Sequence, residues 1–413
     1  MKPPPPASAT KAKAPLSVAE ALGRILDGVT PTGLETVPLM EACGRVLAAN
    51  VVATLTQPPF DASAMDGYAV RAADVTQLPA TLALRGESAA GSAFIGRVGV
   101  GETVRIFTGA PVPEGADAIV LQENVIRDGS SVTVQTGRPD RGHIRPRGGD
   151  FKEGEILIAA GRRITARDIT LAAAAGHATL AVRRRPEVAI LATGDELVDP
   201  GTRPGAAQIV CSNPYGVAAM VAKAGGTPRL LGIARDTRES LTEKIAAAAG
   251  ADVLLTIGGA SVGDHDLVTP VLQERGMKLA FWKIAMRPGK PLLFGRLGDQ
   301  RVIGVPGTPV SSLVCTRVFL VPLIRRLLGL ESEDDAGLPA VLARDVEANG
   351  PRQHYMRAKL TPRAGALPTV ATVASQDSSL LKVLAEADCL LVRAPNAPAL
   401  PAGSEVTVLP LDF

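Results

Sequence analysis

The middle of the chain alternates short apolar runs with stretches of helical spacing, the pattern of an α/β layer fold. Four of the runs are almost entirely apolar and too short for globular helices, which predicts strands buried on both faces. They cover residues 188–193, 230–234, 253–257 and 302–305. The predicted helices between them close at Gly225, Gly250 and Gly276, because glycine readily ends a helix. We therefore predict a central α/β sheet domain over residues 186–330.

Three amphipathic stretches outside this domain predict further helices. They cover residues 17–27, 39–49 and 164–175. The first has Ser17 and Glu20 placed for a capping box, in which each satisfies a backbone amide of the helix start. We place these helices in a linker domain of helices and strands that comprises residues 16–56 and 147–185.

Two parts of the chain show short alternating runs divided by Gly and Pro turns, which is typical of β-rich domains. The first lies between Tyr68 and Gln135 and predicts a β-rich domain, residues 57–146, inserted into the linker domain. The second predicts a small C-terminal β-barrel-like domain, residues 331–413, with one helix over residues 380–387. The predicted fold class is thus a multidomain α/β protein.

Composition and charge indicate a cytoplasmic protein. The chain has 413 residues, 46% hydrophobic and 21% charged, and its 44 basic residues exceed its 41 acidic ones only slightly, which argues against nucleic acid as a partner. Residues 1–15 lack the apolar core of a secretion signal and predict a disordered tail. The most hydrophobic stretch, 313–328, is broken by arginines and a proline, so no membrane span is expected. The four cysteines form no C-x-x-C pair and are expected to be reduced, buried thiols: Cys43, Cys211, Cys315 and Cys389.

Carboxylates directly follow three of the predicted strands. Glu196 and Asp236 each follow one strand, and Asp264 and Asp266 follow a third. If the strands are parallel neighbours, these acids gather at one edge of the sheet and repel one another unless a cation lies among them. Oxygen ligands favour Mg²⁺, with either Asp264 or Asp266 completing the set. The alternative is that each acid only caps the helix that follows it.

Turns near these acids are suited to anions. Arg287 and Lys290 flank a Pro-Gly turn, so their side chains can converge on one point. The turn 306–307 leads into a helix that contains Ser311, and the amides at a helix start attract anions. With the hydroxyl of Ser261 and the neighbouring acids, these groups predict a cleft for a divalent metal and an anionic substrate.

Two segments of the inserted part carry further polar groups. Residues 57–68 show neither the helical nor the strand period of apolar residues and are expected to form a loop. They contain Asp61 and Asp66. Functional groups favour such loops, although a plain surface turn fits equally well. Residues 141–150 alternate arginine and glycine up to Asp150, which suits an oxyanion site or a solvated basic loop.

Six motifs make the chain from Leu16 onward resemble the molybdopterin molybdenumtransferase family, the MoeA and gephyrin E-domain type. They are FDASAMDGYA (60–69), TGAPVP (108–113), TGDEL (193–197), GGASVGD (258–264), RPGKP (287–291) and PGTPVS (306–311). Any one of them alone is a weak signal. All six in the order of the family are a specific one.

The resemblance implies that molybdenum from molybdate is inserted into adenylylated molybdopterin, with Mg²⁺-dependent release of AMP, in the final step of molybdenum cofactor synthesis. It also implies a homodimer that works with molybdopterin adenylyltransferase and with molybdoenzyme-specific chaperones. The implied catalytic set is Asp66, Asp150, Glu196, Asp236 and Asp266, of which the last three hold the metal. The implied substrate-binding set is Asp61, Thr108, Thr193, Gly194, Gly258, Gly259, Ser261, Pro306 and Gly307. The implied molybdate-binding set is Arg287, Lys290, Ser311, Arg352 and Ser379.

Two other functions compete with this one. Molybdopterin adenylyltransferases resemble residues 188–328 but lack the inserted β-rich domain and the C-terminal β domain. A purely scaffolding role, as gephyrin acquired, is the second alternative. It is disfavoured because the sequence contains no long linker or fused adenylyltransferase domain and keeps the acidic set.

Overall fold

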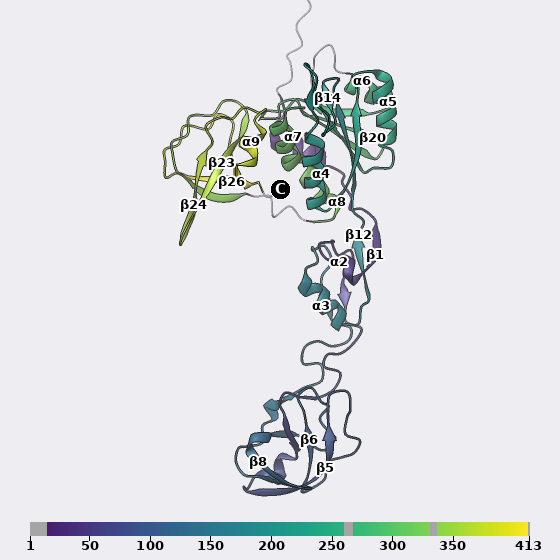
Figure 1. Cartoon of the computed structure of the whole chain (residues 1–413), viewed down its shortest axis with the longest axis vertical. Helices are drawn as coiled ribbons and strands as arrows, with labels where there is room; N and C mark the ends of the chain where they lie inside the picture. Colours follow the sequence, from purple (N-terminus) through teal and green to yellow (C-terminus); the bar gives the residue numbers. More distant parts are fainter. Residues whose placement is uncertain (1–14, 260–266, 331–336, 412–413) are drawn as a thin grey trace, which may run out of the picture. The chain divides into compact units, whose positions relative to one another are not determined.

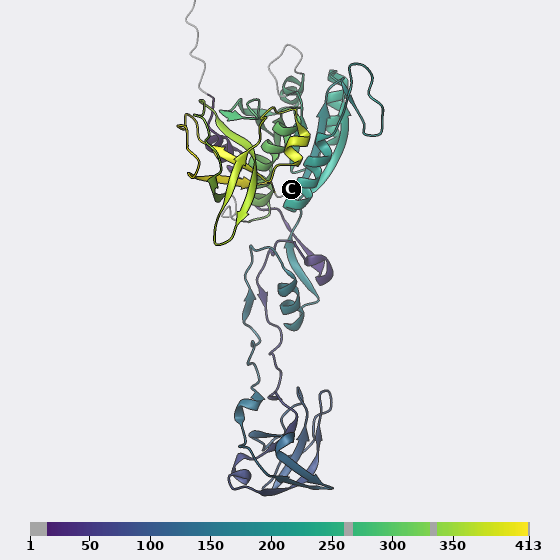
Figure 2. The same ribbon diagram turned by 60° about the vertical axis from the view of Figure 1, so that its left-hand side comes forward.

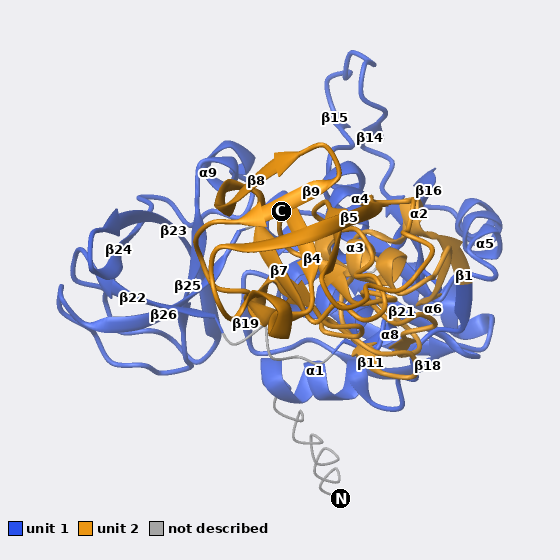
Figure 3. Ribbon diagram, turned by 90° about the horizontal axis from the view of Figure 1, so that it is seen from below, with its two compact units in different colours: residues 1–35, 183–413 blue, residues 36–182 orange. Residues whose placement is uncertain are grey.

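The computed structural model describes residues 15–259, 267–330 and 337–411 of the chain (Figure 1). The chain forms two compact units, coloured separately in Figure 3. The first unit comprises Met1–Glu35 and Arg183–Phe413, and the second comprises Thr36–Val182. The predicted disordered tail lies outside the described residues, apart from residue 15, and the predicted limits of the individual domains stay predictions.

A six-stranded sheet forms the centre of the first unit. Its strands, in spatial order, are β16 (Thr227–Ala234), β13 (Glu187–Thr193), β17 (Val253–Ile257), β21 (Gln300–Val305), β20 (Leu293–Leu297) and β18 (Lys278–Trp282). The first four are parallel, β20 runs antiparallel to β21, and β18 runs antiparallel to β20. All five residues of β17 are buried, as expected for a central strand with helices on both faces. The four strands predicted from the apolar runs are therefore confirmed, together with their parallel arrangement.

Helices cover both faces of this sheet (Figure 1). On one face lie α5 (Arg238–Ala247) and α6 (Val268–Glu274), whose apolar side chains share a core with alternate residues of the strands. On the other face lie α4 (Asn213–Ala224), α7 (Pro309–Cys315) and α8 (Val321–Leu327). The stretch η4 (Thr316–Leu320), a π-helical turn, joins α7 to α8. As predicted, α4 ends at Gly225, whose φ of +102° suits glycine.

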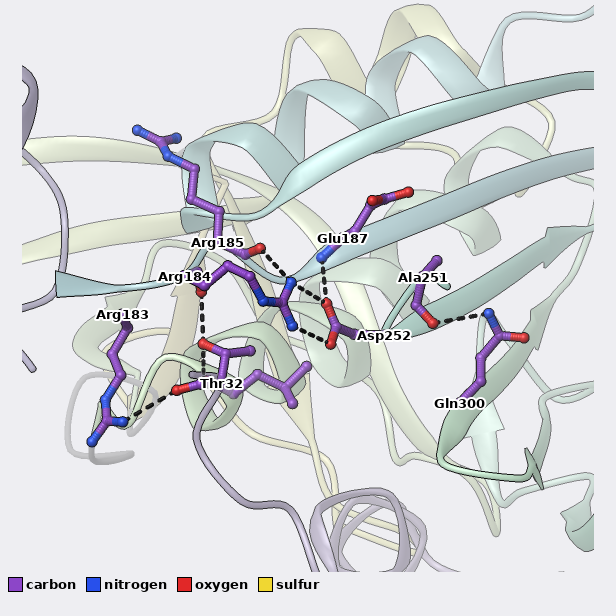
Figure 4. A network of polar contacts seen from close by, with 9 residues as sticks. Thr32, Arg183, Arg184, Arg185, Glu187, Ala251, Asp252 and Gln300 are labelled. Atoms are coloured by element: carbon purple, nitrogen blue, oxygen red, sulfur yellow. Dashed lines mark hydrogen bonds and ion pairs between the residues drawn. The ribbon is translucent and has the colours of Figure 1, made fainter. Parts of the chain in front are cut away.

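Charged hydrogen bonds hold the amino ends of β13 and β17 (Figure 4). The Asp252 carboxylate accepts two hydrogen bonds from the Arg184 guanidinium, at 2.7 and 3.0 Å, and one from the Glu187 amide at 2.7 Å. These bonds raise the pKa of Arg184, with the Asp252 side chain as the main cause. The register of the two strands is thus set at the end opposite to the predicted site.

Helix α1 (Val18–Leu26) begins with the predicted capping box between Ser17 and Glu20. The helix belongs to the first unit, which includes residues up to Glu35. The buried Arg301 guanidinium donates to the Ile25 and Asp27 carbonyls at the end of α1. These bonds to the central sheet, which no local pattern shows, hold the helix there.

The C-terminal part of the first unit is a closed five-stranded β-barrel, drawn in yellow and green in Figure 2. Its strands are β22 (Leu338–Leu342), β23 (Gln353–Arg363), β24 (Ala366–Thr372), β25 (Cys389–Arg393) and β26 (Glu405–Pro410). The barrel closes because β23 pairs with both β24 and β25. The short β19 (Met286–Arg287) adds to β23 in parallel. The helix expected over residues 380–387 is shorter, α9 (Leu381–Ala385).

The second unit contains a six-stranded sheet in the order β7, β4, β6, β5, β9, β8. These strands are β7 (Ala118–Leu121), β4 (Gly67–Val70), β6 (Glu102–Ile106), β5 (Ala80–Ser88), β9 (Ser131–Val134) and β8 (Val125–Asp128). The predicted β-rich part is therefore present. Residues 57–68 are not wholly a loop: β3 (Ala62–Ser63) pairs with β10 (Ile144–Arg145), and β4 begins at Gly67.

The remainder of the second unit mixes helices and strands around a separate apolar core. It contains α2 (Leu39–Ala42), β2 (Val51–Val52), β11 (Ile156–Ile158) and α3 (Ala166–Ala174), and β12 (Thr179–Arg183) pairs with β1 (Leu34–Pro38).

Helix α2 is much shorter than the helix predicted for residues 39–49. Gly44 has a φ of +74°, and beyond it Val46 and Leu47 bridge to Arg163 and Val182 in extended conformation. Tertiary pairing overrides the amphipathic pattern there. The burial expected for all four cysteines is also wrong at Cys43, which follows α2 and is exposed. Within the described ranges, no helix is long and apolar enough to cross a membrane.

Two glycines near the end of β17 differ in whether the structure has room for a side chain. Gly258 has a φ of +93°, and a Cβ there would lie 2.7 Å from the Thr193 carbonyl oxygen. A Cβ at Gly307 would lie no closer than 3.6 Å to the Gly258 Cα, and its φ is not positive. We expect Gly258→Ala to lower the free energy of unfolding of the first unit by about 1–3 kcal/mol, and Gly307→Ala to change it by less than about 0.5 kcal/mol.

Urea unfolding followed by the fluorescence of Trp282, the single tryptophan of the chain, measures both variants in the sheet that contains them. Equal midpoints for Gly258→Ala and the unsubstituted protein would show that the turn tolerates a side chain.

Candidate functional site

A cavity of about 650 Å³ opens at the carboxyl ends of the parallel strands in the first unit. This is the edge where open α/β sheets bind their ligands. Eight residues of the predicted site line it: Thr193, Gly194, Glu196, Asp236, Gly258, Gly259, Gly307 and Ser379. Residues from the ends of β13, β16, β17 and β21 are thus brought together, as their parallel order predicts.

The floor of this cavity is made of closely approaching backbone. Gly258 and Gly259 have φ angles of +93° and +59°, and any Cβ at Gly259 would lie 2.3 Å from a methyl group of Val268. Thr193 is only 5% exposed, and among the described residues its hydroxyl has no hydrogen-bond partner. A buried hydroxyl without a partner costs free energy, and this one belongs to a residue of the cavity wall.

The two described carboxylates of the site lie on exposed loops at the rim. Glu196 folds back over Gly194, where a Cβ would lie 2.4 Å from the Glu196 carboxylate oxygen. Asp236 lies on the neighbouring loop, and its amide donates to the Asp195 carboxylate at 3.2 Å. Ser261, Asp264 and Asp266 lie outside the described residues. In the ranges 15–259, 267–330 and 337–411, no three His, Cys, Asp or Glu side chains could hold a metal together, so the three-carboxylate site stays a prediction.

One wall of the cavity is apolar and was not predicted. It is formed by β14 (Leu197–Val198) and β15 (Ile209–Val210), which pair in parallel, and by Cys211. Ile209 and Val210 are 58% and 40% exposed although they are apolar. Burial raises the pKa of the Cys211 thiol, which therefore stays neutral. The signal that could have identified this wall is an apolar pair next to the Gly- and Pro-rich stretch 199–205.

A second cavity, of about 500 Å³, adjoins the first, and its lining contains three basic residues and one acidic residue, Asp377. Gly307 and Thr308 lie on the walls of both. The predicted site residues in the second cavity are Arg287, Lys290, Pro306, Gly307, Ser311 and Arg352. The hydroxyl of Thr308 hydrogen-bonds that of Ser311 at 2.7 Å and does not cap α7. Four of the five residues predicted to bind molybdate are therefore neighbours.

Ser379, the fifth, lies in the first cavity, and its neighbour Ser378 lines the second. The Asp377 carboxylate accepts hydrogen bonds from the Ser379 amide and hydroxyl, at 2.9 and 2.8 Å, which lower the pKa of Asp377. The buried Arg357 fixes this segment by donating to the carbonyls of Ser375, Asp377 and Leu380. Sequence reasoning did not assign this role to Arg357, because the pattern does not show which basic residue is buried.

His354 lies beneath the cationic wall and is 7% exposed. Burial, together with the nearby charges of Arg287, Arg352 and Arg357, lowers the pKa of His354 to about 4. The imidazole is therefore neutral at physiological pH and adds no charge to the wall.

The remaining predicted residues lie in the second unit. The Asp66 carboxylate accepts hydrogen bonds from the Thr108 amide and hydroxyl, at 2.8 and 2.9 Å. These two bonds, the amide first, lower the pKa of Asp66. The Asp61 carboxylate accepts from the Arg147 amide at 2.7 Å, and the Asp150 amide donates to the Gln57 carbonyl. Asp66 and Thr108 are thus brought together, and Thr108 stabilises the charged carboxylate of Asp66.

Sequence reasoning missed Arg105, which fixes the strand next to Asp66. Its guanidinium lies over the rings of Tyr68 and Phe107, at 5.1 and 4.7 Å from their centroids, and donates to the Gly67 carbonyl. Its charge also contributes to the lowered pKa of Asp66.

Three family models match the chain and together span most of it. The MoeA N-terminal region (domain I and II) matches residues 16–176, a probable molybdopterin binding domain matches residues 189–326, and the MoeA C-terminal region (domain IV) matches residues 339–411. A relative from Haemophilus influenzae, named molybdopterin molybdenumtransferase, is 33% identical over 96% of this chain and 99% of its own. A relative of the same name from Nostoc is 36% identical over 91% of this chain and 88% of its own.

Solved structures agree with the predicted fold. A crystal structure of a molybdopterin biosynthesis MoeA protein from Pyrococcus horikoshii matches with a TM-score of 0.84 and 30% identity, over 96% of this chain and 99% of that one. A second structure of such a protein from the same organism has a TM-score of 0.72 and 27% identity, over 95% and 99% of the two chains. The predicted multidomain α/β fold, with its C-terminal β-barrel, is thereby confirmed.

The pairing of Asp66 with Thr108 predicts a shift in acidity. The hydroxyl of Thr108 stabilises the charged carboxylate, so its removal in Thr108→Ala should raise the pKa of Asp66 toward the ordinary aspartate value. Carbon-13 NMR of the aspartate carboxylates over a pH titration measures this. Thr81→Ala is the matched control, because the Thr81 hydroxyl bonds Thr133 in the same sheet. An unchanged pKa in Thr108→Ala would contradict the role of the hydroxyl.

Proposed function

Because the chain belongs to the molybdopterin molybdenumtransferase family, we propose that it transfers molybdenum from molybdate into adenylylated molybdopterin with release of AMP. Membership in the family establishes a transferase of molybdenum cofactor biosynthesis. The substrates and the metal dependence are the proposal.

The observation that carries the proposal is that two adjoining cavities with different linings share wall residues. One has carboxylates, glycine turns and an apolar wall, and the other has Arg287, Lys290 and Arg352. Both include Gly307 and Thr308, so ligands in the two cavities would be neighbours. A large substrate with apolar and phosphate parts suits the first, and a small dianion such as molybdate suits the second.

The residues of the chain act by positioning in this proposal. Lys290 and Arg287 gather molybdate, the arginine through a planar fork that matches an oxyanion. The glycine turns allow the backbone to approach the adenylylated molybdopterin. Holding two reactants next to each other supplies a large part of the rate enhancement in many enzymes.

Mg²⁺ belongs to the proposal through Glu196, Asp236 and Asp266. The oxygen donors of the first two fit a hard cation, and both lie at the rim of the first cavity. When bound, Mg²⁺ would neutralise the phosphate charge of the substrate. The family resemblance also supports a homodimer in the cytoplasm that works with molybdopterin adenylyltransferase and with chaperones of molybdoenzymes.

Release of AMP from adenylylated molybdopterin by the purified protein tests the proposal. We expect release to require both molybdate and Mg²⁺. Lys290→Gln should raise the molybdate concentration for half-maximal release by about tenfold or more, since a charged hydrogen bond contributes about 1.5–3 kcal/mol.

The matched control is Lys278→Gln, because Lys278 is an exposed lysine of β18 that lines neither cavity. Release at the same rate without molybdate would overturn the proposal. ATP-dependent adenylylation of molybdopterin by the same protein would favour the adenylyltransferase alternative instead.

A further inference from the structure

Two loops at the rim of the first cavity carry its two described carboxylates. The loop 194–196 follows β13 and contains Glu196, and the loop 235–237 follows β16 and contains Asp236. The Gly194 amide donates to the Ala234 carbonyl at 3.2 Å, which links the points where the two loops begin. This bond alone leaves the residues beyond it free to separate.

Arg235, on the loop 235–237, binds the backbone of the loop that contains Glu196. One nitrogen of its guanidinium donates to the carbonyls of Asp195 and Leu197, at 3.0 and 3.4 Å. These two carbonyls lie on either side of Glu196. The Arg235 amide donates to the Ser240 hydroxyl at 3.0 Å, which anchors the arginine at the start of α5.

Asp195, on the loop that contains Glu196, binds the backbone of the loop 235–237. Its carboxylate accepts the hydrogen bond from the Asp236 amide at 3.2 Å. The arrangement is reciprocal: the arginine before Asp236 fixes the backbone around Glu196, and the aspartate before Glu196 fixes the backbone of Asp236.

We propose that Arg235 and Asp195 are positioning residues that hold the carboxylates of Glu196 and Asp236 at the spacing needed to bind a divalent cation. The inference rests on the proposed function, in which these carboxylates hold Mg²⁺. Two carboxylates repel each other when no cation is bound, so unlinked loops would move apart and lower the affinity for the ion. Residues that orient the ligands of a metal commonly affect its affinity by about 10–100-fold.

Binding of Mn²⁺ to the full-length protein, measured from the loss of the electron paramagnetic resonance signal of free Mn²⁺, tests this without turnover. We expect Glu196→Gln to abolish the binding that the unsubstituted protein shows, and Arg235→Gln to weaken it by about tenfold or more. Arg238→Gln is the matched control, because Arg238 lies three residues further on and pairs with Glu274.

Two variants at Asp195 distinguish positioning from direct binding of the ion. Asp195→Asn keeps an oxygen that can accept the Asp236 amide and should stay within about threefold of the unsubstituted affinity, whereas Asp195→Ala should lose about tenfold. Equal losses in both would show that the charge of Asp195 binds the ion, and would overturn its positioning role.

The outcomes separate the inference from the proposed function. If Glu196→Gln abolishes binding and Arg235→Gln binds normally, the positioning role of Arg235 is wrong and the metal site stands. If Glu196→Gln and the unsubstituted protein behave alike, the metal site itself is wrong, and the inference with it. Thermal unfolding of each variant shows whether a loss of binding reflects a loss of the fold.

Discussion

The parallel pairing of β13 with β16 on one side and β17 on the other is the constraint on which the site depends. In this register Thr193 lies beside Ala234, and Ala192 lies beside Ile257, so three strands end at one level. Glu196, three residues beyond β13, and Asp236, two residues beyond β16, must then lie at the same edge. An antiparallel neighbour would instead have placed one of these acids at the opposite end of the sheet.

The same register decides where the cationic cavity lies. The Gly258 amide donates to the carbonyl of Val305, so the turns after β17 and β21 are adjacent, and Gly307 reaches both cavities. Gly258 matters here for its positive φ and for the absence of a Cβ, which would contact Thr193. Gly307 and Thr308 thus lie at the boundary between the two cavities.

Local sequence patterns predicted the central strands and the helix ends correctly, and they failed where contacts between distant parts of the chain determine the backbone conformation. The strands of the central sheet and the end of α4 at Gly225 agree with their apolar runs and glycine punctuation. The predicted helix at residues 39–49 fails because Leu47 pairs with Val182, far along the chain. The acids at the strand ends could be predicted to lie together, because parallel strands place their carboxyl ends at one edge of the sheet. The wall formed by Ile209 and Val210 was missed, because it depends on the pairing of β14 with β15 across the stretch 199–205, which was not predicted.

The neutral His354 limits how the cationic cavity can respond to pH. Its pKa is lowered from 6.5 to about 4, so no proton is gained there between these values while the chain is folded. An unfolded chain would gain that proton near pH 6.5, so the folded state loses stability as the pH falls from about 6.5 toward 4. Any change in oxyanion binding near neutral pH must therefore come from the ligand or from other groups, and not from the imidazole beneath the wall.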